Sequence, residues 1–367
     1  MSIYCKKCSI NNSSPDAFFD EDGVCSICKG EYLNKSAEVF ALAYKRAIEF
    51  QNFLKHKNND NYHCILMLSG GKDSIYMMHQ LKEEFNARQL AYTFSQPYES
   101  GSAENNIKNS IQKLGIEHIS YTPNIHVYNK IMKSAFIEKQ YSKEVRIIKM
   151  PCYVCNSLMQ ISAVILAQKL GIPYVVYCAD PMQVTHFCSD VNEAIDVIVS
   201  NCGKELLYEF FTKQSIEKIQ STDNNLLPKI VFPYAGIKYN AQKIIDHLRE
   251  LGVYNTTPEE THCNFWSLLH YYSFRRYDSF FYSTELAYNV RNGMISRDDA
   301  IRFLELYKHI ILNIAPKSQL SAEEKEYILK VLTLKYPKGG SALDFEYNNI
   351  LSMHKIAKDL NVDFKDI

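Results

Sequence analysis

The 367-residue chain is long enough to bury a substantial core and to form two or three domains, since a domain usually takes about 100 to 200 residues. Its 41 basic residues balance its 41 acidic ones, so composition gives no overall attraction to nucleic acid or to an anionic membrane. No run approaches the roughly 18 consecutive apolar residues of a membrane-spanning helix, and no apolar signal region opens the chain. We therefore expect a soluble, cytoplasmic protein with no membrane partner.

The chain contains 11 cysteines, and its first four form two CxxC pairs, Cys5 with Cys8 and Cys25 with Cys28. Two such pairs can supply four thiolates to one tetrahedral ion, so the spacing predicts a structural Zn²⁺ site, with free core cysteines or a redox dithiol as alternatives. An Asp22-Gly23 turn between the pairs predicts a small hairpin. Residues 1–34 are therefore expected to form a zinc ribbon that is too small to fold without its metal.

Apolar spacing predicts a helix over 35–56, and a charged, asparagine-rich linker completes the segment 35–60. From residue 61 strands and helices alternate, which predicts an α/β domain over 61–265 with a parallel sheet and helices on both faces. Ligands of such sheets bind at the carboxyl ends of strands. Strands are expected at 63–68, 90–95, 117–121 and 172–177, with a proline-containing strand end at 231–236, and helices after residue 74 and at 103–114, 157–170 and 240–251.

The segment Ser69-Gly70-Gly71-Lys72-Asp73-Ser74 joins the first of these strands to a helix. Two glycines at a strand-to-helix junction expose backbone N–H groups at the positive end of the helix, which predicts a phosphate site. The glycines allow close approach of the backbone, and the hydroxyls of Ser69 and Ser74 can donate to phosphate oxygens. Lys72 can neutralise charge on a bound phosphate, while Asp73 suits a Mg²⁺ ligand or a brace of the loop.

This stretch matches the SGGxDS signature of the PP-loop ATP pyrophosphatases, and the chain resembles that superfamily. The resemblance implies an adenine nucleotide alpha hydrolase-like fold, and cleavage of ATP between its α and β phosphates. A substrate oxygen would attack the α-phosphorus, pyrophosphate would leave, and an adenylated intermediate would remain. By the same analogy Tyr92, Thr93 and Phe94, at the end of the second strand, would contact adenine, although aromatic residues in strands often belong to the core.

A third CxxC pair, Cys152 with Cys155, opens the helix that continues to residue 170, and a lone Cys263 follows much later. Thiols at a helix N-terminus have lowered pKa values and suit metal binding or sulfur transfer. The order of the PP-loop, this pair and the lone cysteine resembles the iron-sulfur-dependent tRNA thiolation enzymes. That resemblance implies a 4Fe–4S cluster on Cys152, Cys155 and Cys263, with an open iron for the transferred sulfur. The alternatives are a second zinc site with His262, or buried cysteines, and Cys178 and Cys188 compete as the third ligand.

A second resemblance extends over most of the chain and points to the N-acetyl sugar amidotransferases of bacterial surface-glycan synthesis. It is carried by the first CxxC pair, the segment FDEDGVCSIC, SGGKDS, Pro123-Asn124-Ile125 and residues 292–300. It implies that ammonia from a glutaminase partner replaces the carbonyl oxygen. Both resemblances share the adenylation step and differ in the nucleophile.

The last segment, 266–367, is expected to be helical, with core-packing aromatic residues at helical spacing from Phe265 to Tyr288 and helix starts capped by Ser296 and Ser321. We expect an enzyme that adenylates a carbonyl oxygen and replaces it with sulfur from a sulfide donor. A small molecule with an amide-like carbonyl is favoured over tRNA as the substrate, because the basic residues do not cluster strongly. A homodimer is compatible with the sequence. The non-enzymatic alternative is a zinc-ribbon binding module with a decayed nucleotide fold.

Overall fold

The computed structural model describes residues 3–15, 17–30, 34–56, 61–137, 150–180, 183–237, 239–261 and 263–367. The chain divides into two compact units. One comprises Met1–Ser36, Ser142–Met150 and Cys263–Ile367, and the other comprises Ala37–Tyr141 and Pro151–His262. The N-terminal cysteine segment thus belongs to the same unit as the C-terminal helices, whereas the sequence analysis treated them as separate segments.

Five parallel strands form the sheet of the second unit, in the order β3-β2-β1-β4-β5. The strands are β1 (Cys64–Met67), β2 (Gln89–Phe94), β3 (His118–Tyr121), β4 (Tyr174–Val176) and β5 (Lys229–Val231). The chain moves outward from β1 to β3 and then returns to the other side of β1, so the strand order reverses between β1 and β4. The expected parallel α/β fold, with the PP-loop after the first strand, is confirmed.

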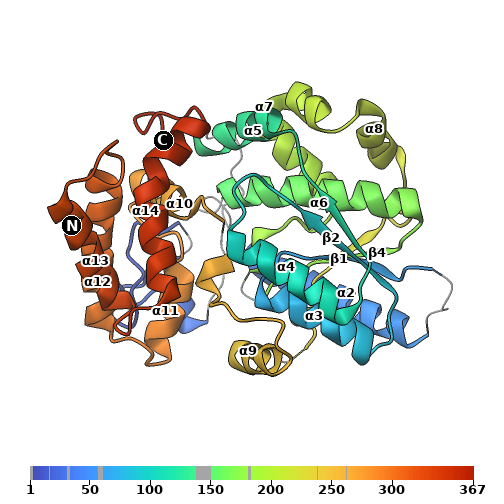
Figure 1. Cartoon of the computed structure of the whole chain (residues 1–367), viewed down its shortest axis with the longest axis horizontal. Coiled ribbons are helices and arrows are strands. Elements are labelled where there is room, and N and C mark those ends of the chain that lie inside the picture. Colours follow the sequence, from blue (N-terminus) through green and yellow to red (C-terminus); the bar gives the residue numbers. More distant parts are fainter. Residues whose placement is uncertain are drawn as a thin grey trace. The chain divides into compact units, whose positions relative to one another are not determined.

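Successive residues of β1 face opposite sides of the sheet and so bury two separate layers of helices. On one face, Cys64 and Leu66 join a core that contains Ile75 and Met78 of α3 (Lys72–Glu83). On the other face, the hydroxyl of Tyr92 is hydrogen-bonded to Ser162 of α6 (Met150–Leu170). Figure 1 shows α3 and α6 on either side of the strands. The first layer also contains α2 (Asn34–Lys55), α4 (Gly101–Leu114) and α9 (Ala241–Glu250).

Three helices of this unit were not predicted, namely α5 (Ile125–Ile137), α7 (Val191–Phe210) and α8 (Lys213–Ser221). Local signals for two of them are present. The Asp190 side chain accepts a hydrogen bond from the N–H of Glu193, and Thr212 caps α8 in the same way. Gly203 has φ +82 and kinks α7, which interrupts the helical pattern along that stretch.

The first unit is helical apart from the N-terminal turns, as expected. The helical spacing noted from Phe265 to Tyr288 falls on two helices, because Asp278 adopts a left-handed conformation with φ +50 and ends the first of them. The caps at Ser296 and Ser321 are confirmed, and Glu324 completes a capping box with Ser321. The helices are α1 (Ser26–Lys29), α10 (Trp266–Tyr277), α11 (Ser283–Arg291), α12 (Arg297–His309), η5 (Ile310–Ile314), α13 (Ala322–Lys335) and α14 (Ser341–Asp359).

One helix of the described chain, α6, is long and apolar enough to cross a membrane by length and composition. However, 67% of the window that meets this test is buried inside the protein. Its length and apolar character follow from its position against the sheet, where it packs as a core helix.

Candidate active site and metal centre

The loop Ser69–Gly71 runs from the carboxyl end of β1 into the first turn of α3. Gly70 has φ +75, and a Cβ atom at this position would lie 2.3 Å from the carbonyl oxygen of Ala103. Gly71 precedes the helix in an extended conformation, and among the described residues no side chain caps the helix there. The loop therefore presents backbone N–H groups at the positive end of a helix, which suits phosphate.

The hydroxyls of two serines brace the loop. The Ser69 and Ser74 hydroxyl oxygens lie 3.3 Å apart, and Ser74 Oγ donates to the Gly71 carbonyl oxygen at 3.0 Å. Asn106 of α4 adds a third contact, because its Nδ2 donates to the Gly70 carbonyl oxygen at 3.1 Å. The same amide donates to Thr256 Oγ1 at 2.9 Å, so one buried side chain joins the loop to the segment after α9.

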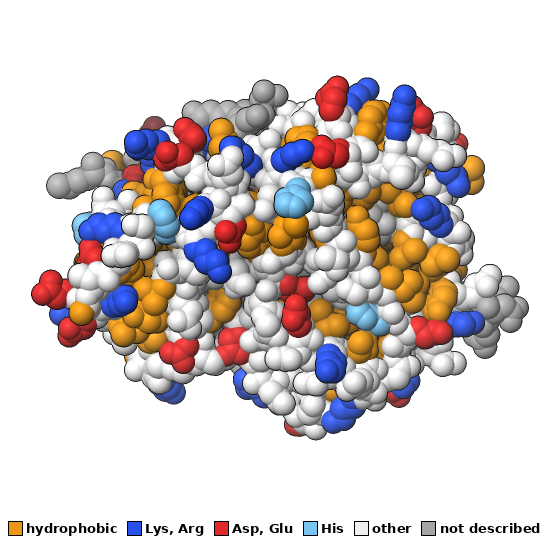
Figure 2. All heavy atoms as spheres, turned by 45° about the horizontal axis from the view of Figure 1, so that its top comes forward, with side chains coloured by type: hydrophobic (Ala, Val, Ile, Leu, Met, Phe, Trp, Pro, Cys, Tyr) orange, Lys and Arg blue, Asp and Glu red, His pale blue; other side chains and the backbone are white. Residues whose placement is uncertain are grey.

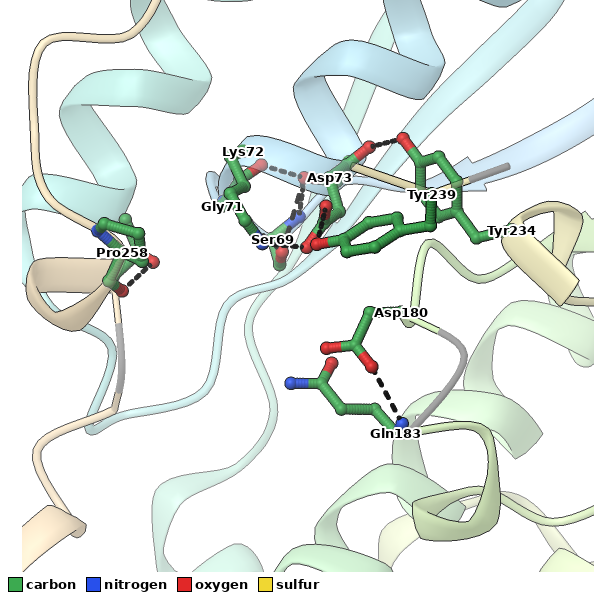
Figure 3. A network of polar contacts seen from close by, with 11 residues as sticks. Ser69, Gly71, Lys72, Asp73, Asp180, Gln183, Tyr234, Tyr239 and Pro258 are labelled. Carbon is green, nitrogen blue, oxygen red and sulfur yellow. Dashed lines mark hydrogen bonds and ion pairs between the residues drawn. The ribbon is translucent and has the colours of Figure 1, made fainter. Parts of the chain in front are cut away.

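Lys72 and Asp73 form an ion pair at the start of α3, with 2.5 Å between Nζ and Oδ2. Their side chains are only 14% and 15% exposed, so the pair is little screened by solvent. Two tyrosines from the segment after β5 also contact Asp73. Tyr239 donates its hydroxyl to Asp73 Oδ1 at 2.9 Å, and Tyr234 donates to the Asp73 carbonyl oxygen at 2.8 Å (Figure 3). Asp73 is thus held at three atoms.

A second carboxylate near the loop, Asp180, was not singled out by the sequence analysis. It follows β4, which is the strand beside β1, and its Oδ1 accepts the N–H of Gln183 at 3.1 Å. Figure 3 shows both side chains on the side of the loop where Tyr234 lies. The pKa of the Tyr239 hydroxyl is raised by burial, and then by the charges of Asp73 and Asp180. The signal for Asp180 in the sequence was its position directly after an apolar strand, where ligands of parallel sheets bind.

The thiol of Cys178 lies in the same region. Burial raises its pKa well above the ordinary value, and the charge of Asp73 adds to the effect. A thiol in these surroundings stays protonated, which does not favour metal binding.

The residues expected to contact adenine lie in a packed strand. Thr93 is 4% exposed, and its Oγ1 donates to the carbonyl oxygen of Leu68 at 2.8 Å, immediately before the loop. Phe94 is also 4% exposed and packs against Tyr121 and Phe210. Thr93 therefore positions the loop in this structure, and contact of either residue with adenine stays a prediction.

Cys152 and Cys155 lie in the first two turns of α6, both partly buried. Residues three apart on a helix share a face, so the pair can present two thiols together. Cys155 Sγ lies 3.3 Å from the hydroxyl of Tyr128. Cys263 belongs to the other compact unit, and His262 lies outside the described residues. The three-cysteine site therefore remains a prediction.

The four N-terminal cysteines, by contrast, come together. The Sγ atoms of Cys5, Cys8, Cys25 and Cys28 all lie within 4.8 Å of one another. Zn–S bonds of about 2.3 Å in a tetrahedron place sulfurs roughly 3.8 Å apart. Two of the pairs fit this, at 3.6 Å for Cys8 with Cys25 and 3.9 Å for Cys5 with Cys28.

Hydrogen bonds join these sulfurs to one another and to backbone N–H groups, and with burial they shift the thiol pKa values in both directions. The pKa of Cys25 is lowered to about 5, chiefly by its hydrogen bond with Cys8, while that bond and burial raise the pKa of Cys8. The N–H groups of Lys7 and Cys25 each lie 3.3 Å from Cys5 Sγ. The group can therefore hold a metal ion, and its full set of four thiols leaves no ligand position for a substrate.

The cysteine group is attached to the C-terminal helices of the same unit. Ala287 and Val290 of α11 pack into its small apolar core. Arg297 donates Nε to the Cys5 carbonyl oxygen at 2.8 Å, and Tyr4 donates its hydroxyl to Glu305 at 2.5 Å. A metal at this site would thus stabilise the helical unit as well as the ribbon.

No family model and no curated protein matches the chain. Among solved structures it is similar to the U34-tRNA thiolase NcsA from Methanococcus maripaludis, solved with its 4Fe–4S cluster, at 17% identity and a TM-score of 0.36. That match covers 88% of this chain and 94% of the other. It is also similar to NMN synthetase from Francisella tularensis, at 13% identity, a TM-score of 0.30, and 66% and 93% coverage. At such scores, evidence about function comes from this chain's own residues.

Proposed function

We propose that this protein binds ATP at Ser69–Ser74, adenylates a carbonyl oxygen of its substrate and then replaces that oxygen with sulfur. The supporting observation is the position of the SGGKDS loop. It lies at the carboxyl end of β1, next to the reversal of strand order, with a lysine in the first turn of the following helix. A phosphate chain placed there meets backbone N–H groups and one cation.

In the first step, the N–H groups of the loop and the exposed hydroxyl of Ser69 orient the phosphates of ATP, while Ser74 holds the loop through the Gly71 carbonyl oxygen. The substrate carbonyl oxygen forms a bond to the α-phosphorus, and the bond from that phosphorus to the bridging oxygen breaks. Lys72 stabilises the charge that develops on the leaving pyrophosphate. In the second step, a sulfur nucleophile adds to the carbonyl carbon, and the original oxygen leaves on AMP.

Magnesium suits the carboxylates of this region, because Mg²⁺ prefers oxygen ligands and usually binds through one or two carboxylates together with phosphates. Asp73 would hold it on the protein side. In the structure the two carboxylate oxygens of Asp73 contact Lys72 and Tyr239, which also fits its predicted role as a brace of the loop.

Sulfur is favoured over ammonia by Cys152 and Cys155, whose helical spacing suits a metal cluster completed by Cys263. A 4Fe–4S cluster bound there would supply sulfide delivered by a donor protein. Ammonia transfer would instead need a glutaminase partner, and it gives these cysteines no chemical role.

A small molecule with an amide-like carbonyl is the proposed substrate class, and the cytoplasm the proposed location. On the face drawn in Figure 2, Lys and Arg side chains are interspersed with Asp and Glu. This mixture gives little of the sequence-independent attraction that a tRNA backbone would require. A tRNA substrate would be revealed by binding that weakens steeply as salt is raised.

Anaerobic purification followed by iron, zinc and acid-labile sulfide analysis tests the choice of nucleophile. Wild type is expected to carry about four iron and four sulfide per chain beside one zinc. The iron should be lost in Cys152→Ala while the zinc remains. Zinc alone, with no sulfide after anaerobic reconstitution, would contradict sulfur transfer and favour the ammonia mechanism.

A further inference from the structure

Tyr239 contacts both charged residues at the start of α3. Its hydroxyl donates to Asp73 Oδ1 at 2.9 Å, and its ring centroid lies 5.6 Å from Lys72 Nζ. Its ring packs edge-on against Tyr234, with centroids 5.4 Å apart and planes at 75°. Tyr234 is itself fixed, being 1% exposed and hydrogen-bonded to the Asp73 carbonyl oxygen. The tyrosine hydroxyl at 239 is therefore held against the carboxylate by packing.

These contacts divide the two oxygens of Asp73 between two donors. Oδ1 accepts from Tyr239, and Oδ2 accepts from Lys72 at 2.5 Å. A lysine held this way must exchange the carboxylate for phosphate when a nucleotide arrives. Asp73 is only 15% exposed, so water compensates poorly for the lost partner. A second donor that stays on the carboxylate lowers the cost of the exchange.

We propose that Tyr239 is a positioning residue that retains Asp73 when Lys72 moves to the phosphates of ATP. Tyr239 acts through Asp73 and needs no contact with the nucleotide. Burial and the two nearby carboxylates keep its hydroxyl protonated, so it can only donate to Asp73. This inference rests on the proposed function, because it takes ATP as the ligand of Lys72.

The test is the dissociation constant of Mg–ATP, measured by titration calorimetry on the full chain. Tyr239→Phe keeps the ring and removes one hydrogen bond to a charged group, so affinity is expected to fall about 10- to 100-fold. The matched control is Tyr62→Phe, which likewise removes a phenol hydroxyl that donates to a carboxylate, here that of Glu117 just before β3. This control should bind ATP within about threefold of wild type, since surface changes away from the site have small effects.

Two further measurements separate positioning from a general structural role. In an Asp73→Ala background, Tyr239→Phe should change ATP affinity by less than about twofold, because the residue through which Tyr239 acts is gone. Placing 4-aminophenylalanine at position 239 restores a donor and should recover most of the affinity. Melting temperatures without ATP, measured alongside, should fall by no more than a few degrees in Tyr239→Phe, because Lys72 still pairs with Asp73 in the free protein.

The inference is overturned if Tyr239→Phe binds ATP within twofold of wild type while Lys72→Ala has lost binding. It is equally overturned if Tyr239→Phe weakens binding as much in the Asp73→Ala background as in wild type. Failure of the proposed function has a different signature, in which Lys72→Ala binds ATP as tightly as wild type. Because the aminophenylalanine variant keeps both ring and donor, it also shows whether lost affinity reflects misfolding.

Discussion

Substitution of Gly70 by alanine should both destabilise the protein and prevent ATP binding. A Cβ atom there would lie 2.3 Å from the Ala103 carbonyl oxygen and 2.8 Å from its Cα, and neither backbone atom can move without shifting α4. The left-handed backbone costs a residue with a side chain about 1–2 kcal/mol. The backbone shifts that remove the overlap with Ala103 cost roughly 1–3 kcal/mol more. Gly70→Ala should therefore lower the free energy of unfolding by about 2–5 kcal/mol.

Gly115→Ala is the matched control, because Gly115 ends α4 with φ +62 and a Cβ there would meet no atom within 4 Å among the described residues beyond its chain neighbours. It should cost only the backbone part, about 1–2 kcal/mol, and leave ATP affinity unchanged. Urea denaturation gives the two free energies, and calorimetric titration gives ATP affinity. Equal destabilisation by both variants, with ATP still bound by Gly70→Ala, would refute the packing argument for the loop.

Two other outcomes concern the metal group and the titration of a buried acid. Cys8→Ser should lose the zinc that wild type and the strand variant Cys64→Ser retain, as measured with a chromogenic chelator, and equal zinc in all three would contradict the assignment. Burial and then the charge of Glu104 raise the pKa of Glu99 from 4.5 to about 7. Between these two pKa values the folded protein keeps a proton that the unfolded chain releases. The free energy of unfolding therefore falls as pH rises from 4.5 to about 7, by up to about 3 kcal/mol, because each pKa unit corresponds to about 1.4 kcal/mol. Glu99→Gln should flatten this fall in urea denaturation between pH 4.5 and 8, and an unchanged slope would count against it.

The PP-loop could be predicted from the sequence because its elements are adjacent in the chain. An apolar strand, two glycines and a helix start within a dozen residues determine where the N–H groups point. The partners of Asp73 could not be predicted in this way. Tyr234 and Tyr239 lie 161 and 166 residues further along the chain, and only the parallel packing of β5 brings them to the loop.

The same distinction applies to the cysteines. The spacing of the two CxxC pairs was enough to predict that their four thiols meet, and the structure brings them together. Their attachment to Arg297, 292 residues away from Cys5, has no local signal. The helix break at Asp278 was missed because aspartate tolerates the left-handed conformation without the glycine that usually marks it.

Phe94 illustrates how burial limits interpretation from a motif. Its position at the end of the second strand suited a nucleotide contact by analogy, whereas the structure packs it among aromatic rings of the core. A strand buried on both faces has little surface left for a ligand, apart from its carboxyl end. This is why the polar groups that follow the strands, such as Asp180, become the better candidates.

The most direct test of the central claim is the identity of the products formed from ATP. Wild type would be incubated with Mg–ATP, sulfide and candidate nucleobases or N-acyl sugars, with Lys72→Ala as the control. The proposed adenylation predicts AMP and pyrophosphate in equal amounts, formed only with an acceptor and lost in Lys72→Ala. Release of ADP and phosphate, or AMP formation that Lys72→Ala leaves unchanged, would contradict it.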